Sequence, residues 1–149
     1  MNRRVADLRS DYRHFHAITT RWGDNDVYGH VNNVLYYSWF DTVVNQMLIS
    51  HSVLDIEHGP VIALVIETGC NFLSSVAFPD RVTAGLRVAT IGRSSIRYEV
   101  GIFREDEEQA AAQGHLVHVC VERTGRRPTP IPDAMRTVLA TLQVTTISP

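Results

Sequence analysis

The sequence predicts a single α+β domain in which an antiparallel sheet wraps around one long central helix. Residues 33–50 are apolar on most of a helical circumference, and a helix of that kind needs covering structure on most sides. Strand-like segments follow this helix one after another with short connections, as in antiparallel sheets. The chain of 149 residues has the length of one domain. We therefore expect residues 1–149 to fold as one domain, with a core at about residues 13–123.

The segment before the central helix combines an expected strand with a polar loop. Residues 13–22 are rich in aromatic and β-branched side chains, which favour a strand, whereas the polar residues 1–12 are expected to be partly mobile. The loop follows, and Asn32 or Asn33 then suits the helix N-cap because an Asn side chain can accept a hydrogen bond from a first-turn amide. The apolar positions at helical spacing behind this cap are Tyr36, Phe40, Val43, Val44 and Met47.

After the central helix, Gly59-Pro60 breaks the chain and strand patterns replace helix patterns. Alternation of apolar and polar residues, the period of a half-buried strand, recurs along most of the segments that follow. The acidic run at residues 105–108 is expected as a solvated hairpin tip. Because consecutive strands with short connections usually pair with each other, we expect an antiparallel meander with one face against the helix. The expected strands are residues 61–73, 82–90, 96–102 and 111–123.

A short helix is expected near the end of the chain. Three prolines at residues 128–132 exclude regular sheet there, and Asp133 begins a pattern with helical period. We expect this helix at about residues 132–143 and a frayed tail at residues 143–149. Its expected apolar face consists of Met135, Val138, Leu139 and Leu142.

Composition excludes several classes of protein. The formal net charge is −2, so we expect no basic surface for nucleic acid. No apolar run reaches about 18 residues and the first residues lack an apolar leader, so neither membrane insertion nor secretion is expected. Cys70 and Cys120 lie in apolar strand-like segments without metal-type spacing, which is typical of buried thiols in a reducing compartment. We expect a cytoplasmic protein with no cofactor and no bound metal.

The loop at residues 21–33 holds the best candidate for catalysis. Asp26 lies just ahead of the helix N-terminus, where unpaired amides and the helix dipole favour negative charge. Those amides could polarise a thioester carbonyl and stabilise a tetrahedral intermediate, and loss of one such donor slows an enzyme roughly 100- to 1,000-fold. A neighbouring carboxylate could activate water as a general base or attack the carbonyl directly. Asp26 suits either role.

Other interpretations of this loop remain open. Asp24 and Asp26 could simply close an Asx-type turn and cap the helix, and His30 could be a structural hydrogen-bonding histidine. Asp24, Asp26 and His30 are also three possible metal ligands, although the sequence indicates no supporting residues around them. Spacing alone therefore leaves the function open.

Residues 21–36 carry the motif RWGDNDVYGHVNNVxY, which resembles the signature of hotdog-fold thioesterases of the 4-hydroxybenzoyl-CoA thioesterase-like family. Its HVNN portion also resembles acyl-carrier-protein thioesterases. In the hotdog fold an antiparallel sheet wraps a long helix, so the resemblance agrees with the expected order of elements over about residues 13–123. It implies an acyl-CoA thioesterase without a cofactor, acting on an acyl-CoA substrate. It also implies a homodimer or homotetramer in which the acyl pocket lies at a subunit interface.

The resemblance implies roles for individual residues. Asp26 would be the catalytic carboxylate, as nucleophile or general base, and residues 29–33 would supply backbone donors to the thioester oxygen. A histidine and an asparagine are catalytic in the carrier-protein enzymes, so the corresponding residues here could assist Asp26. The turn at residues 92–95 corresponds to positions that contact CoA phosphates. The catalytic candidates are Asp26, His30 and Asn32, and the substrate-binding candidates are Gly29, Val31, Asn33, Tyr36, Arg93, Ser94 and Ser95.

Several assignments have alternatives. Glu67, a charge inside an apolar strand, could be a second carboxylate near the helix, although a position in solvent or at a subunit interface is favoured. Arg126 and Arg127 are weaker candidates for phosphate contact. A hotdog enoyl-thioester hydratase is an alternative function, although its D-x-N-P-x-H pattern is only faintly matched by residues 24–30. A non-catalytic acyl-thioester-binding protein is a third. The sequence does not predict the acyl group or the choice between CoA and a carrier protein.

Overall fold

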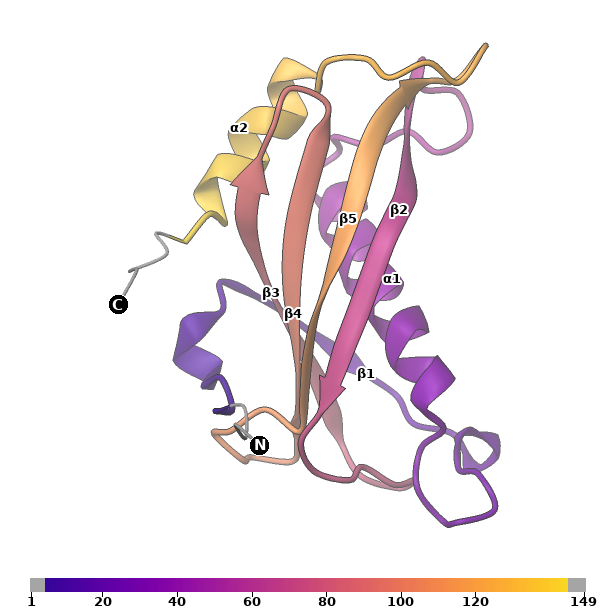
Figure 1. The fold of residues 1–149 in the computed structure, drawn as a ribbon, viewed down its shortest axis with the longest axis vertical. Coiled ribbons are helices and arrows are strands. Elements are labelled where there is room, and N and C mark those ends of the chain that lie inside the picture. The colour runs from indigo at the N-terminus through magenta and orange to yellow at the C-terminus, as the bar shows by residue number, and fades with distance from the viewer. Residues whose placement is uncertain (1–4, 145–149) are drawn as a thin grey trace.

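The computed structural model describes residues 5–144, which form one five-stranded antiparallel sheet packed against a long helix and a short one (Figure 1). The elements are β1 (His14–Ile18), α1 (Asn33–Ser50), β2 (Val61–Phe72), β3 (Val82–Ile91), β4 (Ser95–Arg104), β5 (Ala112–Glu122) and α2 (Asp133–Thr141). The strands lie in the order β1-β3-β4-β5-β2, and α1 crosses one face of the sheet. The predicted α+β arrangement is confirmed. Within the described part of the chain, no helix is both long and apolar enough to cross a membrane.

The central helix has the predicted bounds and the predicted cap. The side chain of Asn32 accepts a hydrogen bond from the amide of Val34 at 3.1 Å, which satisfies one of the first-turn donors. The helix residues that face the sheet are fully buried, and their burial is the main stabilising contribution of this helix. These residues are Phe40, Val43, Val44, Met47 and Leu48.

Strand alternation selects the face that packs on α1. On β4 the predicted apolar positions Ile96, Tyr98, Val100 and Ile102 are all fully buried, and on β3 the same holds for Ala84, Leu86 and Val88. On β5 the buried side is the one that carries His118 and Cys120, whereas Val117 and Val119 are half-buried on the other side. The inner face of the sheet therefore includes one histidine and one tyrosine among its aliphatic residues. The short helix is also confirmed, with Met135, Leu139 and Leu142 buried in the same core.

The predicted meander is wrong in one connection. β2 pairs with β5 at the edge of the sheet, from Val61 opposite Glu122 to Phe72 opposite Ala112, and does not pair with β3. Residues 73–81 therefore carry the chain across the end of the sheet before β3 begins. Alternation specifies which face of a strand is buried but not which strand lies beside it, so the sequence pattern could not exclude the simpler order.

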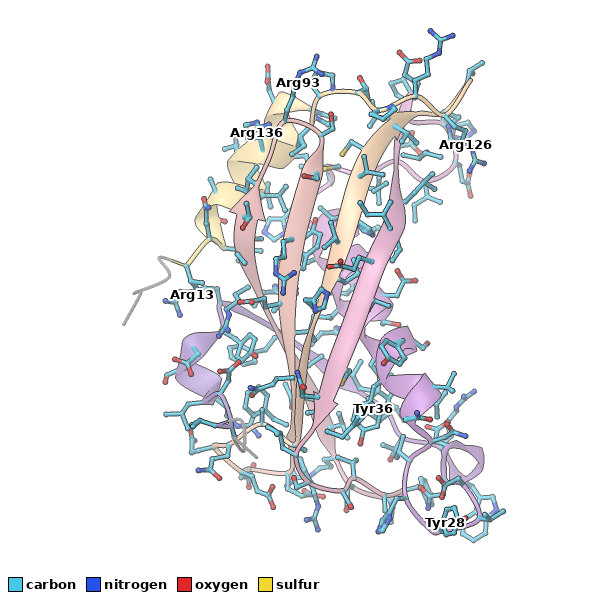
Figure 2. All side chains as sticks on the ribbon, viewed as in Figure 1. Arg13, Tyr28, Tyr36, Arg93, Arg126 and Arg136 are labelled. Atoms are coloured by element: carbon cyan, nitrogen blue, oxygen red, sulfur yellow. The ribbon has the colours of Figure 1, made fainter. Side chains whose placement is uncertain are left out.

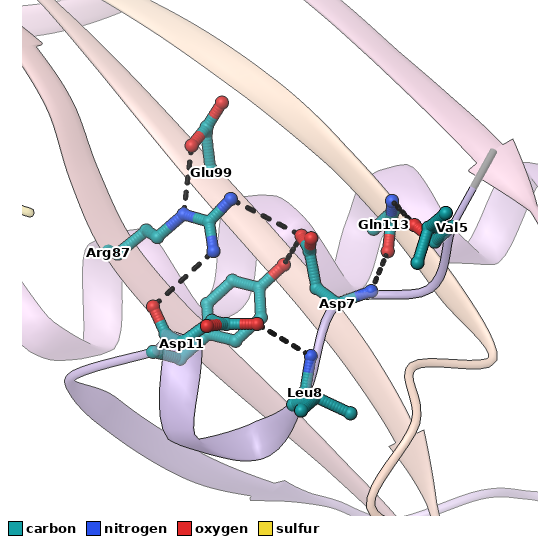
Figure 3. A network of polar contacts seen from close by, with 8 residues as sticks. Val5, Asp7, Leu8, Asp11, Arg87, Glu99 and Gln113 are labelled. Atoms are coloured by element: carbon teal, nitrogen blue, oxygen red, sulfur yellow. Dashed lines mark hydrogen bonds and ion pairs between the residues drawn. The ribbon is translucent and has the colours of Figure 1, made fainter. Parts of the chain in front are cut away.

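The N-terminal segment is packed against the sheet, contrary to the expectation of partial mobility. Tyr12 is buried on the face opposite α1, where its ring covers the paired glycines Gly85 and Gly101. Its hydroxyl donates to the carboxylate of Asp7 at 2.8 Å, and the Arg87 guanidinium bonds the same carboxylate (Figure 3). Burial, followed by the charge of Asp7, raises the pKa of the Tyr12 hydroxyl. This partly buried network holds residues 5–12 against the sheet.

The expected frayed tail at residues 143–149 is wrong at its start, because Gln143 bridges to Val88 of β3 and the amide of Val144 donates to the Val88 carbonyl at 3.1 Å. Residues 1–4 and 145–149 lie outside the described part.

Candidate active site

Asp24 forms hydrogen bonds with both ends of the aspartate loop, residues 21–33. The first strand ends at Ile18, earlier than expected, and Trp22–Asp24 form a short 3-10 turn. The carboxylate of Asp24 is only 2% exposed and accepts hydrogen bonds from the amide of Arg21 at 2.8 Å and from its guanidinium at 3.0 Å. The carbonyl of Asp24 accepts the amide of Asn32 at 2.9 Å. The start of the loop is thereby bonded directly to the residue that caps α1.

Two further bonds attach this loop to the connection between β2 and β3. The side-chain oxygen of Asn25 accepts the amide of Phe78 at 2.9 Å, and the amide of Val31 donates to the carbonyl of Val76 at 2.8 Å. Val76 is itself fully buried in the core. The loop is therefore held from both sides, and its backbone is preorganised before any ligand binds.

Asp26 has one engaged and one available carboxylate oxygen. Its Oδ1 accepts the amide of Tyr28 at 2.8 Å, which is the Asx-type turn that the sequence left open. Its Oδ2 has no hydrogen-bond donor among residues 5–144. The side chain is partly exposed and lines a surface cavity of about 320 Å³ together with Trp22, Asn25, Val27 and Gly29. A carboxylate oriented on one oxygen and open on the other can accept a proton or attack an electrophile.

Some backbone amides of the aspartate loop are bonded within the fold and others are not. Gly29, with φ of +81°, donates its amide to the carbonyl of Asp26 at 3.1 Å, so the amides of Gly29 and Val31 are both occupied within the fold. The amides of His30 and Asn33 have no acceptor in the described part of the chain. Asn33 is the first residue of the 18-residue helix α1, where the helix dipole adds positive potential, whereas His30 lies two residues before the N-cap Asn32. An amide without an acceptor at a helix N-terminus is the kind of donor that can stabilise an oxyanion.

The remaining loop candidates have distinct surroundings. His30 is exposed, and Asn32 uses its side-chain oxygen to cap α1. Tyr36 is 3% exposed and packs edge-to-face against Phe72, with ring centroids 5.0 Å apart. Burial raises the pKa of the Tyr36 hydroxyl to about 12, with a smaller contribution from Cys70. Tyr36 therefore belongs to the core directly below the loop, and it does not line the cavity beside Asp26.

The predicted phosphate-binding turn lies at the other end of the molecule. Figure 2 shows Arg93 and Tyr28 at opposite ends of the long axis, so the turn and the aspartate loop do not meet within one chain. The side chain of Arg93 is exposed, while its carbonyl accepts hydrogen bonds from the amide of Ile131 and the guanidinium of Arg136. The carbonyl of Ser94 accepts the amide of Cys120. Ser95 is half-buried at the start of β4, and Arg126 and Arg127 are exposed.

The contacts of Glu67 and of Asp24 bear on the two remaining interpretations of the sequence, a second carboxylate near the helix and a metal site. Glu67 is exposed on β2 and bonds the ring of His115 at 2.9 Å, with Arg97 at 3.6 Å. Asp24 is occupied by Arg21, which leaves no shared site with His30. Residues 5–144 contain no group of three or more His, Cys, Asp or Glu side chains placed to hold a metal ion.

Sequence reasoning missed two residues of this site. The first is Trp22, which belongs to the motif but received no role from the sequence, and which lines the cavity beside Asp26. The second is Asn25, which connects the loop to Phe78. A tryptophan four residues before the candidate carboxylate was the available signal for the first. The second depends on a contact between residues 53 positions apart, which no local pattern indicates.

Comparison with known proteins identifies the family. The model of the thioesterase-like superfamily matches residues 20–139, which is most of the chain and includes the whole aspartate loop. The chain belongs to the thioesterase-like superfamily. Membership confirms the resemblance in the loop motif and supports thioester hydrolysis as the class of activity. Among curated proteins, none matches the sequence.

Several solved structures of other proteins are similar to this thioesterase-like chain. The PA5185 protein of Pseudomonas aeruginosa is 51% identical, with a TM-score of 0.92 over 94% of this chain and 98% of that protein. PA2801 of the same organism, a candidate thioesterase, is 29% identical with a TM-score of 0.79, covering 85% of this chain and 97% of its own. Slr0204, a 1,4-dihydroxy-2-naphthoyl-CoA thioesterase of Synechocystis, is 17% identical and shares the fold, with a TM-score of 0.77 over 85% and 94% of the two chains. The predicted hotdog fold is confirmed.

Proposed function

We propose that the protein is an acyl-CoA thioesterase that hydrolyses an acyl-CoA ester to the free acid and CoA at Asp26. The observation that carries this proposal is that one loop holds both kinds of group within residues 5–144: Asp26, with one carboxylate oxygen that receives no hydrogen bond, and the amides of His30 and Asn33, which have no acceptor. The carboxylate supplies a base or nucleophile, and the amides supply an oxyanion site. Family membership supports the same class of reaction.

Hydrolysis of the thioester can follow either of two routes. In the first, Asp26 removes a proton from water, the hydroxide adds to the thioester carbon, and the amides of His30 and Asn33 stabilise the resulting oxyanion. Collapse breaks the carbon–sulfur bond, and the CoA sulfur takes the proton held by Asp26. In the second, the Asp26 carboxylate attacks the carbon and CoA leaves as the thiolate. Water then cleaves the mixed anhydride to the free acid and the Asp26 carboxyl, whose proton passes to the thiolate. The exposed ring of His30 and the side-chain amide nitrogen of Asn32 could assist either route by proton transfer or hydrogen bonding.

A second copy of the chain would complete the site. β2 forms an edge of the sheet, and its middle exposes apolar side chains, with Ile66 61% exposed and Val65 47% exposed. Long exposed apolar edges normally pair with another strand. Antiparallel pairing of two β2 strands would bring the Arg93 turn of one copy towards the Asp26 loop of the other, although the two are far apart within one chain. We therefore propose a homodimer, alone or within a homotetramer, in which Arg93, Ser94 and Ser95 bind CoA phosphates of the partner's substrate.

The location proposed for this enzyme is the cytoplasm. The two cysteines in the chain, Cys70 and Cys120, are both free thiols. Free thiols buried in or beside a core are typical of proteins from reducing compartments, where disulfides do not persist.

The decisive experiment measures thiol release from a panel of acyl-CoA esters by wild type and by Asp26→Asn. Asparagine retains an oxygen that can accept the amide of Tyr28, so the loop should keep its shape while the base is lost. We expect a loss of kcat of roughly 100-fold or more, the range of general-base catalysis. Circular dichroism and light scattering establish that both proteins are folded and equally assembled.

Four outcomes would contradict the proposed reaction or the proposed shared site. Undiminished turnover in Asp26→Asn would remove Asp26 from the reaction. Hydration of a 2-enoyl-CoA without thiol release would establish the hydratase alternative. Tight binding of esters without any turnover would establish a binding protein. A monomer in light scattering would contradict the shared site.

A further inference from the structure

The turn between β3 and β4, residues 92–95, is bonded to a side chain of the short helix. Nη2 of Arg136, on α2, donates to the carbonyl of Gly92 at 2.8 Å and to the carbonyl of Arg93 at 3.3 Å. The amide of Ile131 donates to the same Arg93 carbonyl at 2.9 Å. Figure 2 shows Arg93 and Arg136 at the same end of the molecule. The proposed reaction assigns no role to this half-buried arginine.

These bonds fix the direction of two amides in the turn. In a trans peptide unit the C=O and the N–H point in opposite directions. The carbonyl of Gly92 shares its trans peptide unit with the amide of Arg93, and the carbonyl of Arg93 shares one with the amide of Ser94. Because Arg136 binds both carbonyls, both amides are directed away from its guanidinium, and neither has an acceptor among residues 5–144. The turn therefore presents two free donors on the side away from this guanidinium.

Arg136 also places beside the turn a positive charge that no carboxylate neutralises. Within the described part of the chain, neither Arg93 nor Arg136 takes part in an ion pair. Free backbone amides and an unneutralised guanidinium both attract anions, and phosphate is an anion that accepts from both kinds of donor. The arginines that do form ion pairs are Arg21, Arg81, Arg87, Arg97 and Arg104.

We propose that Arg136 is a positioning residue for phosphate binding, which holds the turn in the conformation whose Arg93 and Ser94 amides bind a phosphate of CoA. The inference rests on the proposed function, which assigns the CoA phosphates to this turn. Without the guanidinium, the two carbonyls lose a shared donor and are free to rotate outwards, where their oxygens would repel the phosphate. Because Arg136 does not contact the reacting thioester, its loss should weaken substrate binding and leave the chemical step unchanged.

The kinetic test compares Arg136→Met and Arg136→Lys with wild type on an acyl-CoA and on the S-acyl-pantetheine with the same acyl group, which carries no phosphate. Methionine keeps an unbranched apolar stem and removes the charge and the donors. We expect Arg136→Met to raise KM for the acyl-CoA roughly 10-fold or more, the size of one charge-assisted hydrogen bond, with kcat nearly unchanged. KM for the acyl-pantetheine should not change, and Arg136→Lys should recover part of the loss.

Arg13→Ala is the matched control, because it removes an exposed arginine away from this turn (Figure 2). Its KM for both esters should equal that of wild type. Equal increases in KM for the two esters in Arg136→Met would overturn the proposal, because Arg136 would then only support the fold. An unchanged KM for the acyl-CoA, or a loss confined to kcat, would overturn it as well.

A binding test that needs no turnover separates this inference from the proposed function. Isothermal titration calorimetry measures the Kd of CoA, with pantetheine as the probe without phosphate, for proteins shown by circular dichroism and light scattering to be folded and equally assembled. The Kd of CoA should rise by the same factor in Arg136→Met and stay unchanged in Arg13→Ala. If Arg136→Met does not fold, Arg136→Gln decides by the same criterion, because its amide can still bond one carbonyl but carries no charge.

Equal affinity of wild type and the Arg136 variant for CoA would overturn the proposal. Wild-type binding of CoA that is no tighter than binding of pantetheine would overturn it too, by removing the phosphate site. Absence of thiol release by wild type, with the expected change in the Kd of CoA, would instead refute the proposed reaction alone.

Discussion

Replacement of His118 by phenylalanine should make the stability of the protein less dependent on pH. His118 is 1% exposed on the inner face of β5, its Nδ1 has no hydrogen-bond partner, and its ring meets Tyr98 edge-to-face at 5.5 Å. Burial lowers the pKa of this imidazole to about 4, and the charge of Asp41 opposes the shift only in part. Phenylalanine keeps a ring at this position and removes the titration.

The expected loss of stability follows from the difference between the pKa of His118 in the folded state and in the unfolded state. A free histidine has a pKa of about 6.5, so the unfolded chain binds a proton below that pH, whereas the folded chain does not until about pH 4. Stability from neutral His118 is therefore complete above about pH 6.5 and is lost as the pH falls towards 4. By this linkage, roughly 2 kcal/mol should be lost between pH 7.5 and 5, and about 3 kcal/mol by pH 4.

Urea denaturation at pH 7.5, 6.5, 5.5 and 5 measures this effect in wild type and His118→Phe. Carboxylates lower the stability of both proteins in acid, so the informative quantity is the difference between the two slopes. His58→Gln is the control, because it removes a histidine whose ring is exposed at the surface. The reasoning is refuted if wild type and His118→Phe lose stability in parallel over this range.

Two further substitutions test the loop and the core. Asp24→Ala leaves the amide of Arg21 without its acceptor, so it should lower the free energy of unfolding by about 1–3 kcal/mol in urea denaturation. Arg21→Ala truncates a side chain that is mostly exposed and should lower the free energy of unfolding by less. Equal losses in the two variants would contradict the buried role of Asp24. Gly114→Ala places a methyl group 2.1 Å from the carbonyl oxygen of Gly69 and 2.7 Å from Phe40, so it should lower Tm with a loss of about 3 kcal/mol or more. Gly23→Ala has no neighbour within 4 Å and should be close to neutral, so similar shifts in both variants would contradict the packing argument.

The central helix and the faces of the strands could be predicted because their signals are local. Apolar spacing and one asparagine define α1 and its cap, and period-two alternation identifies the buried positions of β3 and β4. The edge position of β2 could not be predicted in this way. Its pairing with β5 is a contact between segments about 50 residues apart, and alternation is equally compatible with several neighbours.

The N-terminal segment illustrates a second reason for failure. Its polar composition indicates mobility, yet Asp7 and Arg87 satisfy each other beneath Tyr12, and Gly85 and Gly101 leave the space that the ring fills (Figure 3). Arg87, the partner of Asp7, is 80 residues away in sequence, and the glycines under the Tyr12 ring lie on β3 and β4. In the sequence alone, polar residues whose partners are this far away cannot be distinguished from the residues of a solvated loop.

The unpredicted topology also accounts for the fixed geometry of the candidate site. Because β2 lies at the far edge, residues 73–81 must cross the end of the sheet, and they do so directly beside the aspartate loop. This crossing supplies the carbonyl of Val76 that binds Val31, the amide of Phe78 that binds Asn25, and the ring that supports Trp22. A meander with β2 beside β3 would need no such crossing. The motif therefore specifies the chemical groups, whereas the edge position of β2 determines how rigidly they are held.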